Sequence, residues 1–157
     1  MKYSVYIETS VVSYLTARIS RDLIVAGHQQ ISQEWWESIL PRLNAFISEA
    51  VILEASKGDT GAVRMRMQKL AHIKILEINS DVQMLAELYI SRLKIPKKAA
   101  MDALHLAAAS WHGMDYLVTW NCAHIANART ELLLRQINSE REIDTPVICT
   151  PEELMEV

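Results

Sequence analysis

The chain has 157 residues, of which 50% are hydrophobic and 22% are charged. This length and composition predict a single globular domain over residues 1–157, with room for a sizeable core. The formal net charge is −3, so the chain lacks the overall basic balance of a protein that binds nucleic acid chiefly through its electric field. Any contact with nucleic acid must therefore be local.

Cysteine usage and hydropathy indicate the compartment. Cys122 and Cys149 are the only cysteines and form no CxxC pair, which favours a reduced, cytoplasmic environment. The apolar run after Lys2 is short and is interrupted by Glu8, and no uncharged apolar stretch approaches the length of a membrane span. We therefore expect no signal peptide and no association with a membrane.

The first element is an apolar strand that ends at an acidic side chain. Residues 3–7 are rich in Val, Ile and Tyr, which is typical of a strand buried on both faces in a parallel sheet. Glu8 follows directly, and open α/β sheets bind their ligands at the carboxyl ends of strands. Glu8 is therefore a candidate site residue, unless it merely solvates the end of the strand. Thr9 or Ser10 is expected to cap the helix that follows.

A long helix is predicted from Ser20, as its N-cap, to Leu43, because apolar residues recur at helical spacing. Trp35 and Trp36 lie within it. Adjacent helix residues point about 100° apart, so the two indoles cannot both face one core. One of them is either a partly exposed neighbour of the core or part of an interface with a partner or a second copy.

A second strand, residues 45–47, leads into a helix that Ser48 opens and Gly58 ends. Glu49 lies in the first turn of this helix, where a carboxylate complements the helix dipole. Glu54 instead follows three apolar residues, at a position where a solvated side was not expected. We interpret Glu54 as the second candidate acid.

The rest of the chain continues the alternation of helices and strands. In the helix over residues 97–112, Asp102 interrupts an alanine-rich surface and His105 lies on the same face, so a hydrogen bond between them would explain both. Asn121 is a further polar group at a strand end. The other expected elements are helices over residues 60–70, 80–95 and 128–137, strands over 73–78, 116–120 and 146–149, and a capping box from Thr150 to Glu153.

Five strands alternating with helices predict a three-layer α/β domain around a mostly parallel, about five-stranded central sheet. That architecture would gather Glu8, Glu54, Asp102 and Asn121 at one edge. Their oxygen atoms suit a hard divalent cation, Mg²⁺ or Mn²⁺. Without an ion, the like charges would repel one another.

Four segments in this order, YIETS, VILEASKG, AMDALHLAAA and VTWNCAHIAN, resemble the PIN-domain family, and most of all its VapC-type toxin ribonucleases of toxin–antitoxin modules. The resemblance covers nearly the whole chain. It implies a PIN-like fold, metal-dependent hydrolysis of an RNA substrate, a cognate antitoxin protein as partner and, as a further option, a homodimer. By this resemblance the catalytic and metal-binding residues are Glu8, Glu54, Asp102 and Asn121, with accessory hydroxyl groups on Ser10 and Thr119.

Two departures from the family pattern stand out. The family usually has aspartate where this chain has Glu8, and an acid where it has Asn121. Glu8 keeps the charge but is one methylene longer, whereas Asn121 removes a charge and so weakens attraction for a second cation. A PIN-like module that binds RNA or an antitoxin without cleaving RNA would explain these changes equally well. Candidate contacts to the RNA backbone are Arg18, Arg21, Lys97 and Lys98.

Two other functions are disfavoured by the residue patterns. The four glycines form neither a dinucleotide-binding fingerprint nor a phosphate-binding loop. A zinc site from Cys122, His124 and His105 can be written down, but this spacing is not a usual structural zinc pattern.

Overall fold

A five-stranded sheet organises the computed structural model, which describes all residues from 1 to 157. The strand order is β3-β2-β1-β4-β5, and every neighbouring pair is parallel. The sheet is therefore wholly parallel, and the predicted α/β class is confirmed. The strands are β1 (Ser4–Ile7), β2 (Asn44–Ser48), β3 (Lys74–Leu76), β4 (Tyr116–Val118) and β5 (Val147–Cys149).

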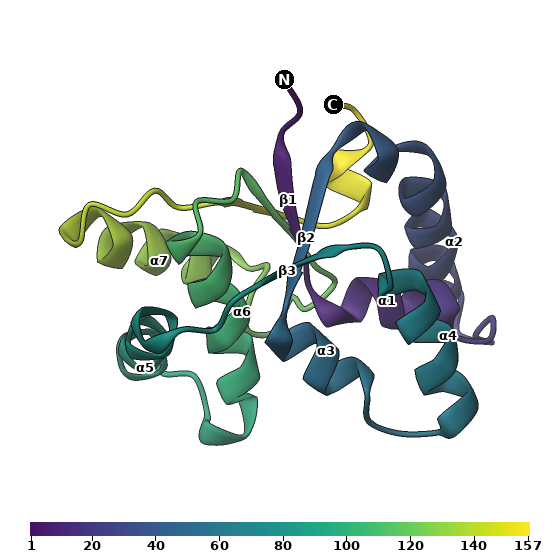
Figure 1. Ribbon diagram of the computed structural model, residues 1–157, viewed down its shortest axis with the longest axis horizontal. Coiled ribbons are helices and arrows are strands. Elements are labelled where there is room, and N and C mark those ends of the chain that lie inside the picture. Colours follow the sequence, from purple (N-terminus) through teal and green to yellow (C-terminus); the bar gives the residue numbers. More distant parts are fainter.

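Helices cover both faces of the sheet, which gives the predicted three layers. In Figure 1 the first four helices lie to one side of β1 and β2, and α5, α6 and α7 lie to the other. None of the helices combines the length and the apolar character needed to cross a bilayer. The helices are α1 (Thr9–Thr16), α2 (Leu23–Ser38), α3 (Glu49–Ala55), α4 (Thr60–Leu70), α5 (Ser80–Leu93), α6 (Ala100–Trp111) and α7 (Ala128–Glu140), with short 3₁₀ helices η1 (Leu40–Arg42), η2 (Lys97–Ala99) and η3 (Glu152–Leu154).

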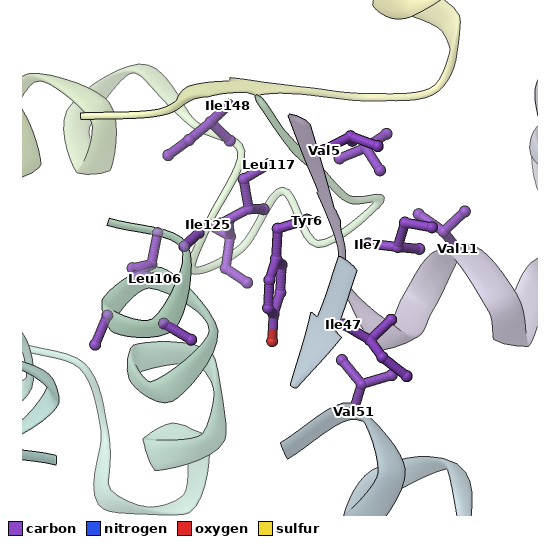
Figure 2. Close-up of a cluster of buried hydrophobic side chains, with 14 of the residues drawn as sticks. Val5, Tyr6, Ile7, Val11, Ile47, Val51, Leu106, Leu117, Ile125 and Ile148 are labelled. Carbon is purple, nitrogen blue, oxygen red and sulfur yellow. The ribbon is translucent and has the colours of Figure 1, made fainter. Parts of the chain in front are cut away.

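The central strand β1 is the most deeply buried element. Val5, Tyr6 and Ile7 have no solvent-exposed surface, because β2 and β4 flank the strand and helices cover both of its faces. Figure 2 shows these side chains packed with apolar residues of the neighbouring strands and helices, with the Tyr6 hydroxyl pointing out of the cluster. A continuous apolar run is what a strand buried on both faces requires.

The register of the sheet brings polar residues together where the strands end. Ile7 is paired with Val118, and the backbone N–H of Glu8 donates to the Val118 carbonyl at 3.1 Å. Ser48 ends β2 beside β1. Because all strands run the same way, the residues that follow them share one side of the domain, which we call the carboxyl edge.

The N-caps differ from those expected, because carboxylates take the place of hydroxyl groups. The Glu8 side chain, rather than Thr9 or Ser10, caps α1 and accepts from the Ser10 N–H. Asp22 caps α2, while the expected cap, Ser20, accepts from the Asp22 N–H. The capping role of Ser48 in α3 is confirmed.

The long helix expected to reach Leu43 ends at Ser38. The chain then tightens into η1, with Pro41 in its first turn, where the missing N–H of proline costs no hydrogen bond. Trp35 is fully buried, and Trp36 is partly buried at the margin of the core. Trp35 is therefore the core residue of the pair and Trp36 its partly exposed neighbour, and an interface role for Trp36 stays a prediction.

Candidate functional site

A groove of about 760 Å³ opens at the carboxyl edge of the sheet. We call it the acidic groove, because Glu8, Glu54 and Asp102 line it together with Asn121. The structure therefore brings together all four residues singled out from the sequence. The remaining wall is formed by Thr9, Ser10, Ser13, Tyr14, Ala17, Arg18, Ser20, Val25, Gln29 and Trp120.

Glu8 is held at the base of the groove by three hydrogen bonds. Its carboxylate accepts from the hydroxyl groups of Ser10 and Thr119, both at 2.5 Å, and from the Ser10 N–H at 3.1 Å. Only 4% of the residue is exposed, and these donors, together with the N-terminus of α1, offset the cost of burying a carboxylate. These bonds hold the Glu8 carboxylate in one orientation.

The hydroxyl groups that surround Glu8 are themselves oriented by the backbone. Ser10 Oγ accepts from the Trp120 N–H at 2.8 Å, and Thr119 Oγ1 accepts from the Asn121 N–H at 2.9 Å. Each oxygen therefore directs its hydrogen at Glu8. The two hydroxyl groups singled out from the sequence, those of Ser10 and Thr119, thus orient the Glu8 carboxylate.

Glu54 is placed by α3 on the neighbouring wall. Its Oε1 accepts from Thr9 Oγ1 at 2.6 Å and pairs with His105 Nε2 at 2.5 Å, whereas Oε2 accepts no hydrogen bond from the protein. Burial raises the pKa of Glu54, but the hydrogen bonds and charge of His105, with help from Thr9, outweigh it, so the pKa lies below its ordinary value. Glu54 is therefore an anion with one oxygen free.

His105 lies behind Glu54, not beside Asp102. The expected Asp102–His105 hydrogen bond is wrong, because both ring nitrogens have other partners: Nε2 meets Glu54, and Nδ1 lies 2.6 Å from the Tyr6 hydroxyl. That hydroxyl is in turn 2.7 Å from Ser48 Oγ. Burial lowers the pKa of His105, but the bond to Glu54 and the three nearby carboxylates raise it more, and the net direction is upward.

Sequence reasoning missed Tyr6 altogether and gave His105 the wrong partner. Tyr6 alternates with apolar residues and so resembles an ordinary core side chain. The available signal was chemical, since the polar tip of a buried tyrosine and the ring nitrogens of a buried histidine both need hydrogen-bond partners.

Asp102, near the start of α6, is half-buried in the groove. Burial raises the pKa of Asp102, the Asn121 side chain opposes that rise, and the negative charge of Glu8 adds to it. Asn121 Oδ1 accepts from the His124 N–H at 3.1 Å, so its amide group is the part of the side chain left for Asp102. Asp102 is the carboxylate most in need of a positive charge.

The donor set fits a hard divalent cation. One ligand atom each from Glu8, Glu54 and His105 lies within 4.8 Å of the others, and Asp102 lines the same groove. Carboxylate oxygens are the ligands that Mg²⁺ and Mn²⁺ prefer. His105 has no free ring nitrogen, so the carboxylates are the available donors. Cys122 is exposed, and neither it nor His124 belongs to this cluster, so the structure does not assemble the Cys122, His124 and His105 set considered for zinc.

Of the four cations considered as RNA contacts, Arg18 alone lines the groove. It lies on the turn between α1 and α2. Gln29 of α2 shapes that turn: it accepts from the Ser20 N–H at 2.8 Å and donates to the Arg18 carbonyl at 2.8 Å. Gln29 thus fixes the backbone of the turn from which the Arg18 side chain extends.

Fold and site together define a class: a wholly parallel α/β domain with buried carboxylates gathered where its central strands end. A family model of the PIN domain matches residues 5–129, which is most of the sequence and includes every residue of the acidic groove. The chain therefore belongs to the PIN-domain family, and the resemblance noted from its motifs is confirmed. No curated protein gives a significant sequence match.

Solved structures with a similar fold include three from bacterial toxins or toxin complexes. The toxin VapC20 of Mycobacterium tuberculosis, described as cleaving the sarcin–ricin loop, has 17% identity and a TM-score of 0.56, over 72% of this chain and 86% of its own. VapBC2 of Rickettsia felis, bound to a promoter DNA fragment, has 14% identity and a TM-score of 0.56, over 94% of this chain and 98% of its own. VapBC-1 of nontypeable Haemophilus influenzae has 14% identity and a TM-score of 0.57, over 95% of this chain and 98% of its own.

Proposed function

We propose that the protein is a metal-dependent endoribonuclease that acts in the cytoplasm as the toxin of a type II toxin–antitoxin module. The observation that carries this proposal is the convergence of Glu8, Glu54 and Asp102 in one groove at the carboxyl edge. Membership of the PIN-domain family supports it, as does the fold shared with a toxin described as cleaving an RNA loop.

In this function the three carboxylates hold Mg²⁺ or Mn²⁺. Bound there, the ion would lower the pKa of a water molecule and stabilise charge on the phosphoryl oxygens. Glu8 would supply a charge held in place by Ser10 and Thr119, and Glu54 would offer its free oxygen. Asp102, whose pKa burial and the charge of Glu8 raise, would gain a positive partner. We assign Asn121 to the same site. Its oxygen already accepts from the His124 N–H, so we expect its amide group to hold Asp102 rather than its oxygen to bind the ion.

The rim of the groove would receive the RNA. Arg18 stands at one side with a charge suited to a backbone phosphate, while Tyr14 and Trp120 contribute aromatic surface to the wall. Because the overall charge of the chain is −3, attraction of RNA would depend on a local cation, and Arg18 is the one in the groove. We therefore propose RNA bound along the groove, with its scissile phosphate beside the carboxylates.

Two protein partners belong to the proposal. The similar VapBC structures carry the names of toxin–antitoxin pairs, and we propose a cognate antitoxin for this chain as well. A homodimer is the second assembly that the family resemblance implies. Sedimentation of the purified chain, alone and with its antitoxin, distinguishes a monomer, a dimer and a heterocomplex.

A second function is favoured by one observation, the neutral Asn121 at a position that is acidic in the family. A PIN-like module that binds RNA or an antitoxin without cleaving it would tolerate that change. Incubation of purified protein with RNA in Mn²⁺ or Mg²⁺ separates the two functions. Cleavage that EDTA abolishes and that Asp102→Asn lacks supports the nuclease, whereas RNA or antitoxin binding without any cleavage by the parent supports the binding module.

A further inference from the structure

A chain of hydrogen bonds runs from the core of the sheet to the acidic groove. It joins Ser48, Tyr6, His105 and Glu54 at successive distances of 2.7, 2.6 and 2.5 Å. We propose that His105, fixed in turn by Tyr6, is a positioning residue that holds Glu54 so that Oε2 alone faces the cation. This inference rests on the proposed function, because it assumes that Glu54 is a metal ligand.

The three inner members of this chain, Ser48, Tyr6 and His105, do not reach the groove. Tyr6, Ser48 and His105 have no solvent-exposed surface, and none of them lines the groove. The Tyr6 ring stands among apolar side chains, and its hydroxyl points out of that cluster (Figure 2). Only Glu54, whose side chain is 28% exposed, reaches from this buried network into the groove.

The hydrogen bond to Glu54 does not depend on the direction of the other bonds in the chain. The Ala50 N–H donates to Ser48 Oγ at 3.1 Å, so the Ser48 hydroxyl hydrogen is free for Tyr6. With a neutral imidazole, Tyr6 then donates to His105 Nδ1, and Nε2–H donates to Glu54. With a protonated imidazole, the Tyr6 and Ser48 hydroxyl groups rotate, and Nε2–H still donates to Glu54. The orientation of Glu54 is thus the same in both states.

Glu54 needs such support because of where it lies. It is the penultimate residue of α3, a helix of seven residues, and a long side chain at a helix end loses conformational freedom when it is ordered. Arg66 steadies the backbone there by donating to the Ala55 carbonyl at 3.1 Å and the Lys57 carbonyl at 2.6 Å. His105 and Thr9 then fix the carboxylate itself, and outer partners of this kind commonly change metal affinity 10–100-fold.

The experiment is a Mn²⁺ titration, followed by the EPR signal of free Mn²⁺, of the full chain and a double-mutant cycle. We expect His105→Leu to weaken Mn²⁺ binding by about 10–100-fold, and His105→Gln, which keeps an N–H donor, to recover part of that loss. In a Glu54→Ala background, His105→Leu should cause no further loss, because a positioning residue acts only through its partner.

Tyr6→Phe provides a variant that keeps the shape of the core. It removes the hydroxyl that meets both His105 Nδ1 and Ser48 Oγ, and we expect it to weaken Mn²⁺ binding several-fold, less than His105→Leu does. Tyr89→Phe is the matched control, since Tyr89 is equally buried and donates to Asn138, which lies on α7 and outside the acidic groove. The control should lose stability without losing Mn²⁺ affinity.

A second readout needs no metal. In the metal-free protein, the His105 Nε2–H should give an exchange-protected imidazole resonance that shifts or disappears in Glu54→Ala. Parent-like Mn²⁺ affinity in His105→Leu, or losses that add in the cycle, would overturn the inference; additive losses would make His105 itself a ligand. A parent chain that binds no Mn²⁺ and cleaves no RNA overturns the proposed function, and the inference falls with it.

Discussion

Glu54 of α3 and His105 of α6 meet through one hydrogen bond of 2.5 Å, with the imidazole fully buried and the carboxylate partly open to the groove. The two residues are 51 positions apart in the sequence, and their helices approach the carboxyl edge from different layers. Their pairing therefore couples the geometry of the site to the packing of the two layers.

This pair should give the metal-free protein a distinct pH dependence of stability. The pKa of Glu54 lies below its ordinary 4.5 in the folded state, so its contribution is fully present above pH 4.5 and is lost as the pH falls through the lowered value. The pKa of His105 lies above its ordinary 6.5, so its contribution is fully present below pH 6.5 and is lost as the pH rises through the raised value.

The pair therefore stabilises most between about pH 4.5 and 6.5. Urea unfolding of the parent and Glu54→Gln between pH 4 and 9 measures this window. We expect the difference in the free energy of unfolding to be largest inside it and to shrink on either side. Equal differences at every pH would show that Glu54 and His105 are not paired in solution.

Asp102→Asn should separate stability from activity. An acid whose folded pKa is raised, as that of Asp102 is, destabilises the folded state once it ionises. The variant should thus be at least as stable as the parent at pH 7–8 without metal. RNA cleavage should fall by at least about 100-fold, because the loss of a ligand costs more than the loss of a residue that only supports a ligand.

Asp144→Asn is the control for that prediction, since Asp144 is exposed and does not line the acidic groove. It should change neither melting temperature nor cleavage. A parent-like rate in Asp102→Asn at saturating Mn²⁺ would remove Asp102 from the site.

Asn121→Asp should tighten Mn²⁺ binding by roughly 10-fold, because ligand charge is a main determinant of affinity for hard cations. Aspartate has the same length as asparagine, so it keeps an oxygen for the His124 N–H while it adds a charge beside Asp102. Without metal the added charge should raise the pKa of Asp102 further and lower stability. Titration of Mn²⁺ into Asn121→Asp and Asn121→Ala, with the parent alongside, tests this; identical affinities would place residue 121 outside the site.

The two cysteines should differ sharply in reactivity. Burial raises the pKa of the Cys149 thiol to about 12, whereas Cys122 is exposed, and the thiolate is the reactive form. At pH 8 a thiol reagent should label one cysteine per folded chain and two after denaturation. Cys122→Ser should abolish the native labelling; rapid modification of that variant would mean that β5 opens readily.

Much of the fold follows from local patterns. The alternation of apolar strands and helices predicts the five strands that the structure has along the chain, and Ser48 is confirmed as an N-cap, with Glu49 inside the first turn of the same helix. Glu8 and Asp22 were missed as caps since charged side chains displaced the neighbouring hydroxyl groups. The four residues of the groove were accessible because strand ends of a parallel sheet share one edge.

The partners of those residues were not accessible in the same way. Which side chain His105 meets depends on how α3 and α6 approach each other, and periodicity does not encode that distance. Helical spacing placed Asp102 and His105 on one face, yet the ring turned to Glu54 and Tyr6, because only they offer hydrogen bonds to both nitrogens at full burial.

The central place of β1 has a consequence for the order in which the protein can be built. This strand, at residues 4–7, pairs with residues 44–46 on one side and 116–118 on the other, so loops of very different length must close around it. Such long-range parallel pairing folds slowly. During synthesis Glu8 leaves the ribosome early, but Asp102, which shares its groove, and Thr119, which fixes it, follow only 94 and 111 residues later. A protein with this topology stays without its acidic centre until translation is nearly complete.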